Sequence, residues 1–201
     1  MKRLPYLLFA AVLLLPLAAL GQDKDKPKDK EEKFPCRIIY VPTSQAVVDK
    51  MLEMAKVKKD DIVFDLGCGD GRIVCTAAKK YGAKGVGVDI DPARIKDCMK
   101  TMEKFGVTKE QVDIRQGDAL KVKDLERATV VMLYMLPEFM EKLEPQLKRL
   151  KPGTRIVAHD YPFPNTDPDE VVEFPTTAGE RPRFLYLWTI PEKKAPEKKK
   201  K

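Results

Sequence analysis

The stretch Val63–Arg72, with the sequence VFDLGCGDGR, decides the fold of this chain. An apolar run ends in an acid, glycine occupies every second position, and a helical pattern begins at Ile73, which predicts a strand, a tight turn and a helix. Glycines lack a Cβ and let a ligand approach the backbone, while the first amides of the next helix point toward that ligand. The dinucleotide pattern G-x-G-x-x-G fits poorly, because counting from Gly67 its third glycine falls on Arg72. The stretch therefore predicts a ligand-binding turn of another kind, D-x-G-x-G-x-G.

Length and composition indicate one globular domain with charged ends. The chain has 201 residues, 43% of them hydrophobic, which is enough to bury a full core. The net charge of +7 comes largely from Lys2, Arg3 and residues 191–201, which leaves about +1 for residues 34–190. The pI of about 9.1 is therefore weak support for a nucleic-acid partner, and we expect none.

The N-terminal residues are typical of an exported or membrane-attached protein. Lys2 and Arg3 precede the uncharged, Leu/Ala-rich residues 4–20, and small residues follow up to Gly21, which predicts a signal peptide at residues 1–21. The alternative is an uncleaved anchor, because residues 4–20 reach the short end of the roughly 17 to 25 apolar residues that span a bilayer. We therefore expect an exported, periplasmic domain or one attached to a membrane through residues 4–20.

Two charged segments flank the expected domain. Residues 22–33 mix lysines and acids with nothing apolar to bury, and residues 191–201 end in four consecutive lysines. Both compositions predict disorder, as a linker and a tail. The globular domain is therefore expected at residues 34–190.

The cysteines do not indicate a metal site. Cys36, Cys68, Cys75 and Cys98 form no C-x-x-C pair, and the chain has one histidine, so we expect no metal. An oxidising compartment would allow disulfides, but Cys75 and Cys98 fall on predicted helices, where buried free cysteine is common. Free thiols are the expectation.

Hydrophobic periodicity then predicts alternating strands and helices. Strands are expected at residues 37–41, 62–66, 84–89, 112–116, 129–133 and 154–159, and helices at 45–55, 72–81, 92–105 and 137–150. The proline-rich residues 161–168 leave no room for another helix, so residues 171–174 and 184–190 are expected to pair as a hairpin. The alternation predicts an α/β fold with a doubly wound, mostly parallel sheet and a C-terminal antiparallel hairpin.

Acidic residues lie at the ends of the expected strands at 84–89 and 112–116. In an open α/β sheet, ligands bind beyond the carboxyl ends of the strands. Asp89 ends one strand, where a carboxylate can accept both hydroxyls of a ribose; alternatively it supports the helix cap at Asp91. Asp118 ends the next strand and could accept from an adenine amino group while Ala119 offers its backbone; alternatively Gly117-Asp118 is an ordinary turn.

Four motifs together resemble the class I, Rossmann-like, S-adenosylmethionine-dependent methyltransferases. They are residues 65–71, 87–91, 117–119 and 150–153, in the order of that superfamily, and they span roughly residues 60–160. The resemblance implies S-adenosyl-L-methionine as cofactor, with the glycine loop under its methionine portion. The cofactor-binding residues that it implies here are Asp65, Gly67, Cys68, Gly69, Asp89, Ile90, Asp118 and Ala119.

Within this class, three further stretches are similar to the mitochondrial lysine methyltransferases of the ATP synthase c subunit and the adenine nucleotide translocator. These stretches are residues 40–44, 69–74 and 161–164. The resemblance implies that Tyr40 and Thr43 fold over the cofactor and that the acceptor is a protein lysine. The N-terminal segment departs from this picture, since the cofactor is made in the cytosol. Either that segment anchors a domain that faces inward, or the domain has lost catalysis or changed its ligand.

The acceptor side of the expected site includes Tyr134, just past the strand at 129–133, and His159-Asp160, at the end of the strand at 154–159. A sulfonium methyl is already a strong electrophile, so the enzyme has to align a neutral amine and exclude water. Desolvation favours the neutral form of lysine. We take Tyr134 and His159 as catalytic candidates, although a lone histidine at a strand end is also typical of a rim residue with one hydrogen bond.

The residues around Tyr134 also bear on the acceptor. Many N-methyltransferases of amides and nucleobases carry Asn/Asp-Pro-Pro-Tyr where this chain has Tyr-Met-Leu-Pro at residues 134–137, which disfavours a nucleobase or glutamine acceptor. A protein-lysine methyltransferase is the leading hypothesis. A small molecule or another protein side chain as acceptor, a nucleotide-dependent oxidoreductase and a nucleotide-binding module without catalysis remain as alternatives.

Overall fold

The computed structural model describes residues 39–176 and 181–192. The expected signal peptide or anchor, the linker, Cys36 and residues 193–201 of the tail lie outside these ranges. The helices are α1 (Gln45–Met54), α2 (Arg72–Thr76), which continues as a π-helical turn (Ala77–Tyr81), α3 (Pro92–Phe105) and α4 (Pro137–Leu147), with 3-10 turns at Ala119–Lys121 and Leu125–Arg127. The strands are β1 (Ile62–Leu66), β2 (Lys84–Asp89), β3 (Val112–Gln116), β4 (Val130–Leu133), β5 (Arg155–His159), β6 (Glu170–Phe174) and β7 (Arg183–Thr189).

One seven-stranded sheet runs through the domain in the order β3-β2-β1-β4-β5-β7-β6. The first five strands in this order are parallel, and β7 pairs antiparallel with both β5 and β6. All four residues of β4 are buried, as expected for a central strand that is covered on both faces. The predicted parallel sheet and terminal hairpin are confirmed.

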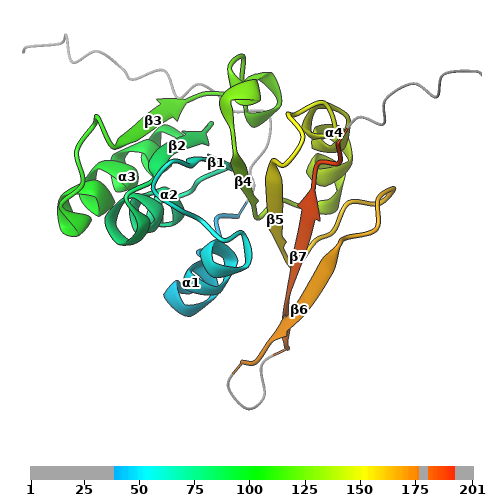
Figure 1. Ribbon diagram of the computed structural model, residues 1–201. Helices are drawn as coiled ribbons and strands as arrows, with labels where there is room; N and C mark the ends of the chain where they lie inside the picture. The colour runs from blue at the N-terminus through cyan, green and yellow to red at the C-terminus, as the bar shows by residue number, and fades with distance from the viewer. Residues whose placement is uncertain (1–38, 177–180, 193–201) are drawn as a thin grey trace, which may run out of the picture. The chain divides into compact units, whose positions relative to one another are not determined.

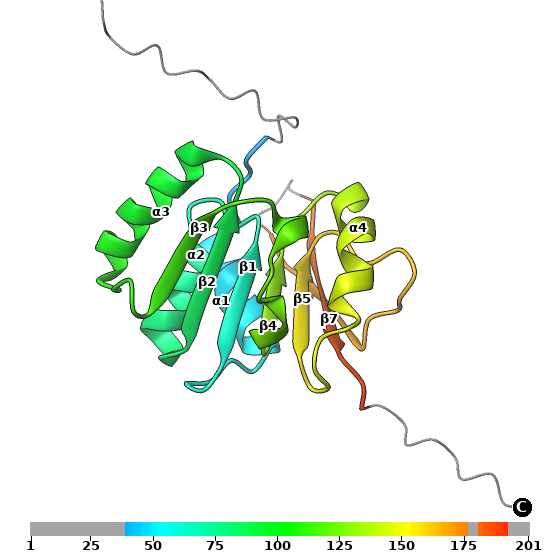
Figure 2. The same ribbon diagram turned by 90° about the horizontal axis from the view of Figure 1, so that it is seen from above.

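Helices cover both faces of the sheet (Figures 1 and 2). Residues of α1 and α2 pack with Val63, Val130 and Val157 on one face, and α3 packs beside α2. On the other face, α4 packs against Phe64, Val131 and other residues of the same parity along the strands. Since successive side chains of a strand point to opposite faces, this division follows from the alternation in β1 and β4. The doubly wound architecture is confirmed.

Local signals set the helix ends. The Ser44 side chain accepts from the Val47 amide at the start of α1, and Asp91 does the same for Ala93 at the start of α3, with Pro92 in the first turn. Gly82 and Gly106 end their helices in the left-handed conformation. Pro145 stays inside α4, so the helix continues through it.

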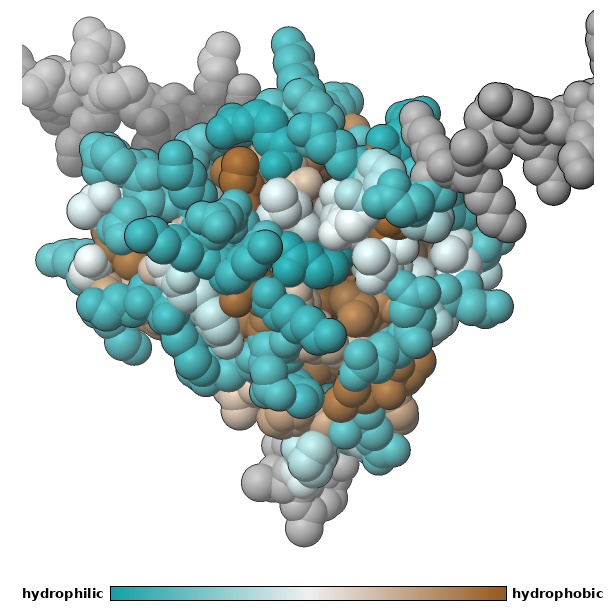
Figure 3. Space-filling model, in the orientation of Figure 1, coloured by the Kyte–Doolittle hydropathy of each residue, from teal (hydrophilic) through white to brown (hydrophobic). Residues whose placement is uncertain are grey.

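Two sequence-based expectations are wrong. The described part of the expected strand at 37–41 has no strand structure, and Ile39 is 84% exposed, because these residues find no neighbouring strand to pair with. The helical spacing of Ile95, Cys98, Met99, Met102 and Phe105 predicts a buried stripe on α3, but Met99 is 40% exposed. Hydrophilic side chains cover most of the face in Figure 3, with apolar patches between them. Within residues 39–176 and 181–192, no helix has the length and hydrophobicity to cross a membrane.

Candidate active site

The glycine loop between β1 and α2 depends on residues without a Cβ. Gly67, Gly69 and Gly71 all have positive φ values, of 81°, 57° and 75°. A Cβ at Gly67 would lie 2.6 Å from the Met135 sulfur, and one at Gly69 would collide with the Tyr40 ring. Backbone strain and steric clash would therefore act together on any larger residue at these two positions.

Asp89, at the end of β2, fixes the shape of the loop. Its Oδ2 accepts from the Gly69 amide at 2.8 Å, and its Oδ1 accepts from the Asp91 amide at 2.9 Å. The carboxylate thus does more than support the helix cap, because one oxygen reaches across to the neighbouring crossover. Burial raises the pKa of Asp89, and the two amide hydrogen bonds oppose that shift.

Asp65 carries the clearest signal for a missing polar partner. The residue is only 2% exposed, and its Oδ2 has no hydrogen-bond partner among the described residues. Burial raises the pKa of Asp65 to about 8, and the negative charges of Asp89 and Asp70 raise it as well. A buried carboxyl oxygen without a partner costs roughly 1 to 3 kcal/mol. A cationic or hydrogen-bond-donating ligand at the loop would remove that cost.

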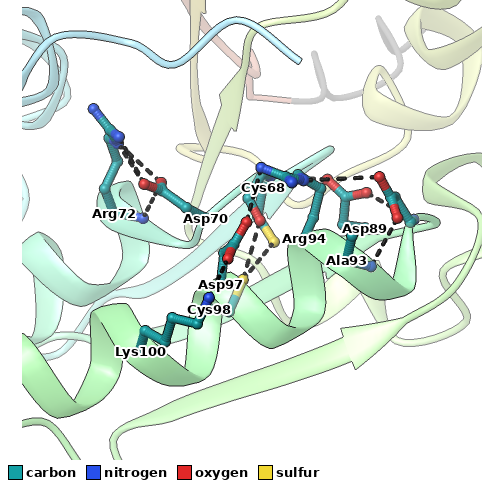
Figure 4. A network of polar contacts seen from close by, with 11 residues as sticks. Cys68, Asp70, Arg72, Asp89, Ala93, Arg94, Asp97, Cys98 and Lys100 are labelled. Carbon is teal, nitrogen blue, oxygen red and sulfur yellow. Dashed lines mark hydrogen bonds and ion pairs between the residues drawn. The ribbon is translucent and has the colours of Figure 1, made fainter. Parts of the chain in front are cut away.

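The segment before α1 lies against the loop. The Tyr40 ring covers Gly69, and the Arg94 guanidinium lies 4.6 Å from the centre of that ring. Arg72 donates to the Thr43 carbonyl at 2.7 Å and forms a bidentate pair with Asp70. Figure 4 shows Arg72 against Asp70, and Arg94 between Asp97 and the start of α3. These contacts hold the segment that contains Tyr40 and Thr43 beside the glycine loop.

Cys68 packs beneath the loop. It is buried, and its sulfur lies 3.9 Å from that of Cys98 on α3, which donates to the Gly69 carbonyl at 3.1 Å (Figure 4). Cys68, Cys75 and Cys98 are free thiols, as expected. Hydrogen bonding to Cys98 and burial raise the pKa of the Cys68 thiol, so it is held in the neutral form.

Asp118 has a structural role at the end of β3. Its Oδ1 accepts from the Leu120 amide at 2.9 Å and caps the 3-10 turn, which begins with the buried Ala119. The Gly117 amide donates to the Asp89 carbonyl, which ties this turn to β2. Ile90 is 37% exposed beside Asp89. Asp118, Ala119 and Ile90 therefore lie on the same edge of the sheet as the glycine loop, and their contact with adenine stays a prediction.

Tyr134 and His159 are brought together at the ends of β4 and β5. Their ring centres lie 4.1 Å apart, and the His159 Nδ1 shares a 3.2 Å hydrogen bond with the Thr43 hydroxyl. His159 is 3% exposed, and its Nε2 has no hydrogen-bond partner among the described residues. Burial lowers the pKa of His159 to about 4, so the imidazole is neutral at pH 7. A neutral ring with so low a pKa is a poor base for an ammonium group.

Asp160 organises the acceptor side of the site. It is a non-glycine residue with a φ of 64°, and its carboxylate is buried. Arg181 and Arg183 each donate to Oδ2 at 2.8 Å, and the Tyr134 hydroxyl lies 3.5 Å from the same atom. A strained backbone that is held by several partners is typical of a functional position. The sequence indicated Asp160 only as a neighbour of His159.

The remaining missed residues come from other parts of the chain. Arg94 on α3, Met135 after β4 and Arg183 on β7 all contact the predicted site. No spacing in the sequence relates these residues to the glycine loop, since each is positioned by the strand order. The Asp70-Gly71-Arg72 motif contained a signal for the Asp70–Arg72 pair, because the two charges are two residues apart in a tight turn.

The residues present fit S-adenosyl-L-methionine. The unpartnered Asp65 oxygen can accept from its ammonium group, the Cβ-free loop gives access to backbone, and Asp89 ends the strand where a ribose is bound in such folds. These are the three groups that the D-x-G-x-G-x-G motif and the acidic strand end predicted.

Comparison with known proteins agrees with this assignment. Residues 65–170 match the family described as the ANTKMT methyltransferase domain. A protein-lysine N-methyltransferase of Saccharolobus islandicus (strain REY15A) is 46% identical over 157 residues, which cover 77% of this chain and 95% of that protein. A lysine N-methyltransferase of the ATP synthase c subunit from Xenopus laevis is 33% identical, and the match covers 66% of this chain and 57% of that protein. The chain thus spans little more than half the length of that animal relative.

Solved structures share the fold and the cofactor. The crystal structure of an RNA methyltransferase from Salinibacter ruber in complex with S-adenosyl-L-homocysteine is 46% identical, with a TM-score of 0.69 over 78% of this chain and 97% of that chain. A SAM-dependent methyltransferase from Geobacter sulfurreducens, also with S-adenosyl-L-homocysteine, is 25% identical, with a TM-score of 0.52 over 60% of this chain and 50% of that chain. Because the family match starts at Asp65 and extends beyond Asp160, the chain belongs to the ANTKMT methyltransferase-domain family and is an S-adenosyl-L-methionine-dependent methyltransferase.

Proposed function

We propose that this enzyme transfers a methyl group to the side-chain amine of a protein lysine. The observation that carries the proposal is the acceptor side of the site. There the Tyr134 ring packs, tilted, against a neutral, buried His159, and the sequence after β4 lacks Asn/Asp-Pro-Pro-Tyr. The 46% identical relative from Saccharolobus islandicus supports it, since that protein is a protein-lysine N-methyltransferase.

The chemistry needs alignment more than acid or base groups. The bound cofactor supplies a methyl group on a positively charged sulfur, which an aligned, uncharged amine can attack directly. Asp65 and Asp89 would hold the bound cofactor through its polar groups, and Tyr40 and Thr43 would exclude water from that side. On the acceptor side, the aromatic face of Tyr134 desolvates the amine, which favours its neutral form. His159 acts by supporting the Tyr134 ring and the Thr43 hydroxyl.

The test is an acceptor assay on the full chain with isotope-labelled S-adenosyl-L-methionine. A lysine-rich unfolded protein is compared with the same protein after acetylation of its lysines, and total RNA is a third acceptor. We expect label in the unmodified protein only, with a mass increase on lysine residues. RNA is included because the Salinibacter ruber structure is described as an RNA methyltransferase. Label in RNA, or equal label in the acetylated protein, would refute a lysine acceptor.

We also propose that residues 1–21 direct the protein to export or hold it at a membrane. The support is the order of Lys2, Arg3 and the uncharged residues 4–20 in the sequence. Fractionation of cells that produce the full chain tests this proposal, with N-terminal sequencing of the mature protein. A cytosolic protein with an intact N-terminus would contradict both versions.

A further inference from the structure

The edge of the sheet where the parallel strands begin, opposite the active site, carries a cluster of basic side chains. We call this cluster the basic edge; it consists of Lys56, Lys58, Lys59, Lys84, Arg149 and Lys151. All six are exposed, and none forms an ion pair or a side-chain hydrogen bond with a described residue. The loops that carry them lie along the lower side of the sheet in Figure 2.

Hydrogen bonds join these loops into one surface. The Lys84 amide donates to the Asp61 carbonyl, which places the start of β2 beside the loop before β1. Arg155, at the start of β5, donates to the carbonyls of Ala55 at 2.8 Å and Lys56 at 3.1 Å. The loop before β1 and the start of β5 are thus held together, although the bonded residues lie 99 and 100 positions apart in the sequence.

Acidic residues do not neutralise this surface. Asp61 is buried and pairs with Arg155 and the Thr129 hydroxyl, so its charge is used inside the protein. Asp60, Glu110, Glu126 and Glu192 are exposed near the same edge. The six residues of the basic edge and Lys109, in the loop before β3, outnumber these four acids, so the basic side chains are in excess.

The C-terminal end of the described chain reaches the same edge. The Ile190 amide donates to the Thr154 carbonyl, and the Gly153 amide donates to the Ile190 carbonyl, both at 2.8 Å. The sequence then continues from Glu192 with six lysines and one further glutamate. The residues that follow Glu192 in the sequence thus carry a net positive charge.

The type of basic group indicates the chemical class of the partner. Five of the six are lysines, which act as point charges toward phosphate, while base stacking on nucleic acid uses exposed aromatic side chains. Among the described residues, the exposed large apolar and aromatic side chains are Ile39, Tyr40, Val41, Ile90, Met99, Leu136 and Val171, and none belongs to the loops of the basic edge. Charge without stacking groups is complementary to a surface of anionic lipid headgroups.

We propose that the basic edge docks this enzyme on a phospholipid bilayer of net negative charge, with the active site directed toward the aqueous phase. The direction follows from the sheet, because the basic edge and the glycine loop lie at opposite ends of the same parallel strands. Electrostatic attraction of this kind falls with ionic strength over a Debye length of about 8 to 10 Å. A protein lysine that approaches from the aqueous phase would then reach the active site.

The test measures binding of the full chain to two sets of vesicles, one of phosphatidylcholine alone and one with a quarter phosphatidylglycerol. The apolar residues 4–20 can bring the chain to either set, so the readout is the ratio of the two partition coefficients. We expect a ratio of about ten or more at 50 mM salt, and its loss at 500 mM salt. The variant Lys58→Glu/Lys59→Glu should lower the ratio to near one.

A matched variant controls for net charge. Lys96→Glu/Lys142→Glu changes the charge by the same amount on exposed positions of α3 and α4, away from the basic edge, and should keep the ratio. Unchanged thermal unfolding and S-adenosyl-L-homocysteine affinity show that both variants fold. Equal binding to the two vesicle sets, or an equal loss in both variants, would overturn the proposal. Binding to a duplex RNA tighter than to anionic vesicles at the same salt would assign the edge to nucleic acid instead.

Discussion

At the scale of single residues, the site is defined by buried carboxyl groups with different partners. Asp65 has an oxygen without any partner among the described residues, whereas Asp160 binds two arginines. The first arrangement is suited to a ligand, and the second holds neighbouring side chains in place. The motif D-x-G-x-G-x-G was enough to predict Asp65. Asp160 could not be assigned this role, because Arg181 and Arg183 lie just before and at the start of β7, and the sequence does not reveal that β7 pairs with β5.

Binding of S-adenosyl-L-homocysteine should release a proton from Asp65. With a pKa of about 8, Asp65 is about 90% protonated at pH 7 before binding, and a cationic amino group favours the ionised form. We expect release of about 0.9 proton at pH 7 and much less at pH 9.5. Isothermal titration in buffers of different ionisation enthalpy measures this number. Asp65→Asn should abolish the release and weaken binding at least tenfold, and an unchanged release in that variant would exclude Asp65 as the source.

Asp160→Asn should slow methyl transfer and leave cofactor binding nearly intact. Asparagine tolerates the positive φ at this position, so the change removes mainly the charge that holds Arg181 and Arg183. We expect a drop of about tenfold or more in kcat with a protein acceptor, and a change of about twofold or less in cofactor Kd.

The double variant with Tyr134→Phe shows whether Asp160 acts through the Tyr134 hydroxyl. If it does, the two losses in kcat are not additive, since the second change removes a group that is already displaced. Fully additive losses, or a loss of cofactor affinity equal to that of kcat, would contradict the positioning role.

At the scale of elements, the sequence predicted those features that local chemistry sets. The glycine turn, the Asp91-Pro92 start of α3 and the central, fully apolar β4 each have their signal within a few residues. The strand at 37–41 was predicted wrongly because an apolar run indicates strand propensity but does not supply a partner strand. Tyr40 lies in the segment before α1 and Gly69 in the loop after β1. Hydrophobic periodicity describes single elements, so it could not reveal this contact.

Gly69→Ala should impair the cofactor site more than it impairs the fold. Its φ is 57° and an added Cβ would collide with the Tyr40 ring, so the loop or the Tyr40 segment has to move. We expect at least a tenfold loss of S-adenosyl-L-homocysteine affinity in a titration. Gly153→Ala is the matched control, because Gly153 has a φ of 80° and a Cβ at this position would have no atom within 4 Å. It should cost about 1 kcal/mol of stability and leave affinity unchanged; equal affinities in the two variants would refute the role of the Tyr40 contact.

At the scale of the whole molecule, the positions of the charged side chains are more informative about binding surfaces than the net charge is. The basic edge could not be predicted from the sequence, since its lysines are separated by whole elements and residues 34–190 sum to about +1. The acceptor side could not be predicted for the same reason, since Tyr134, His159 and Arg183 meet only because β4, β5 and β7 are neighbours in the sheet. Composition therefore does not show which side chains gather at one edge of the sheet, because that depends on the order of the strands.

The contribution of His159 to stability should fall as the pH drops from about 6.5 toward 4, while the raised pKa of Asp65 acts in the opposite direction over the same range. The folded pKa of His159, about 4, is below its ordinary value of 6.5, so the unfolded chain binds the proton first in this range. The stabilisation is complete above pH 6.5 and is lost as the pH approaches 4, by up to about 3 kcal/mol. Urea unfolding at several pH values measures the loss. The difference in unfolding free energy between the wild type and His159→Gln should therefore change over this range by the amount given above, and a difference that stays constant with pH would exclude His159 as its source.

The position of β7 between β5 and β6 has a consequence for how the enzyme is made. The glycine loop, Asp65 and Asp89 are all present once the ribosome has synthesised the first half of the domain, and β1, β2 and β4 can pair without later residues. Asp160 receives Arg183 and the amide of Phe184 only after the last strand has been translated. A nascent chain that folds from its N-terminus therefore completes the glycine loop with Asp65 and Asp89 before it completes the contacts of Asp160. Truncation before Arg183 would remove catalysis while sparing the strands that carry the nucleoside site.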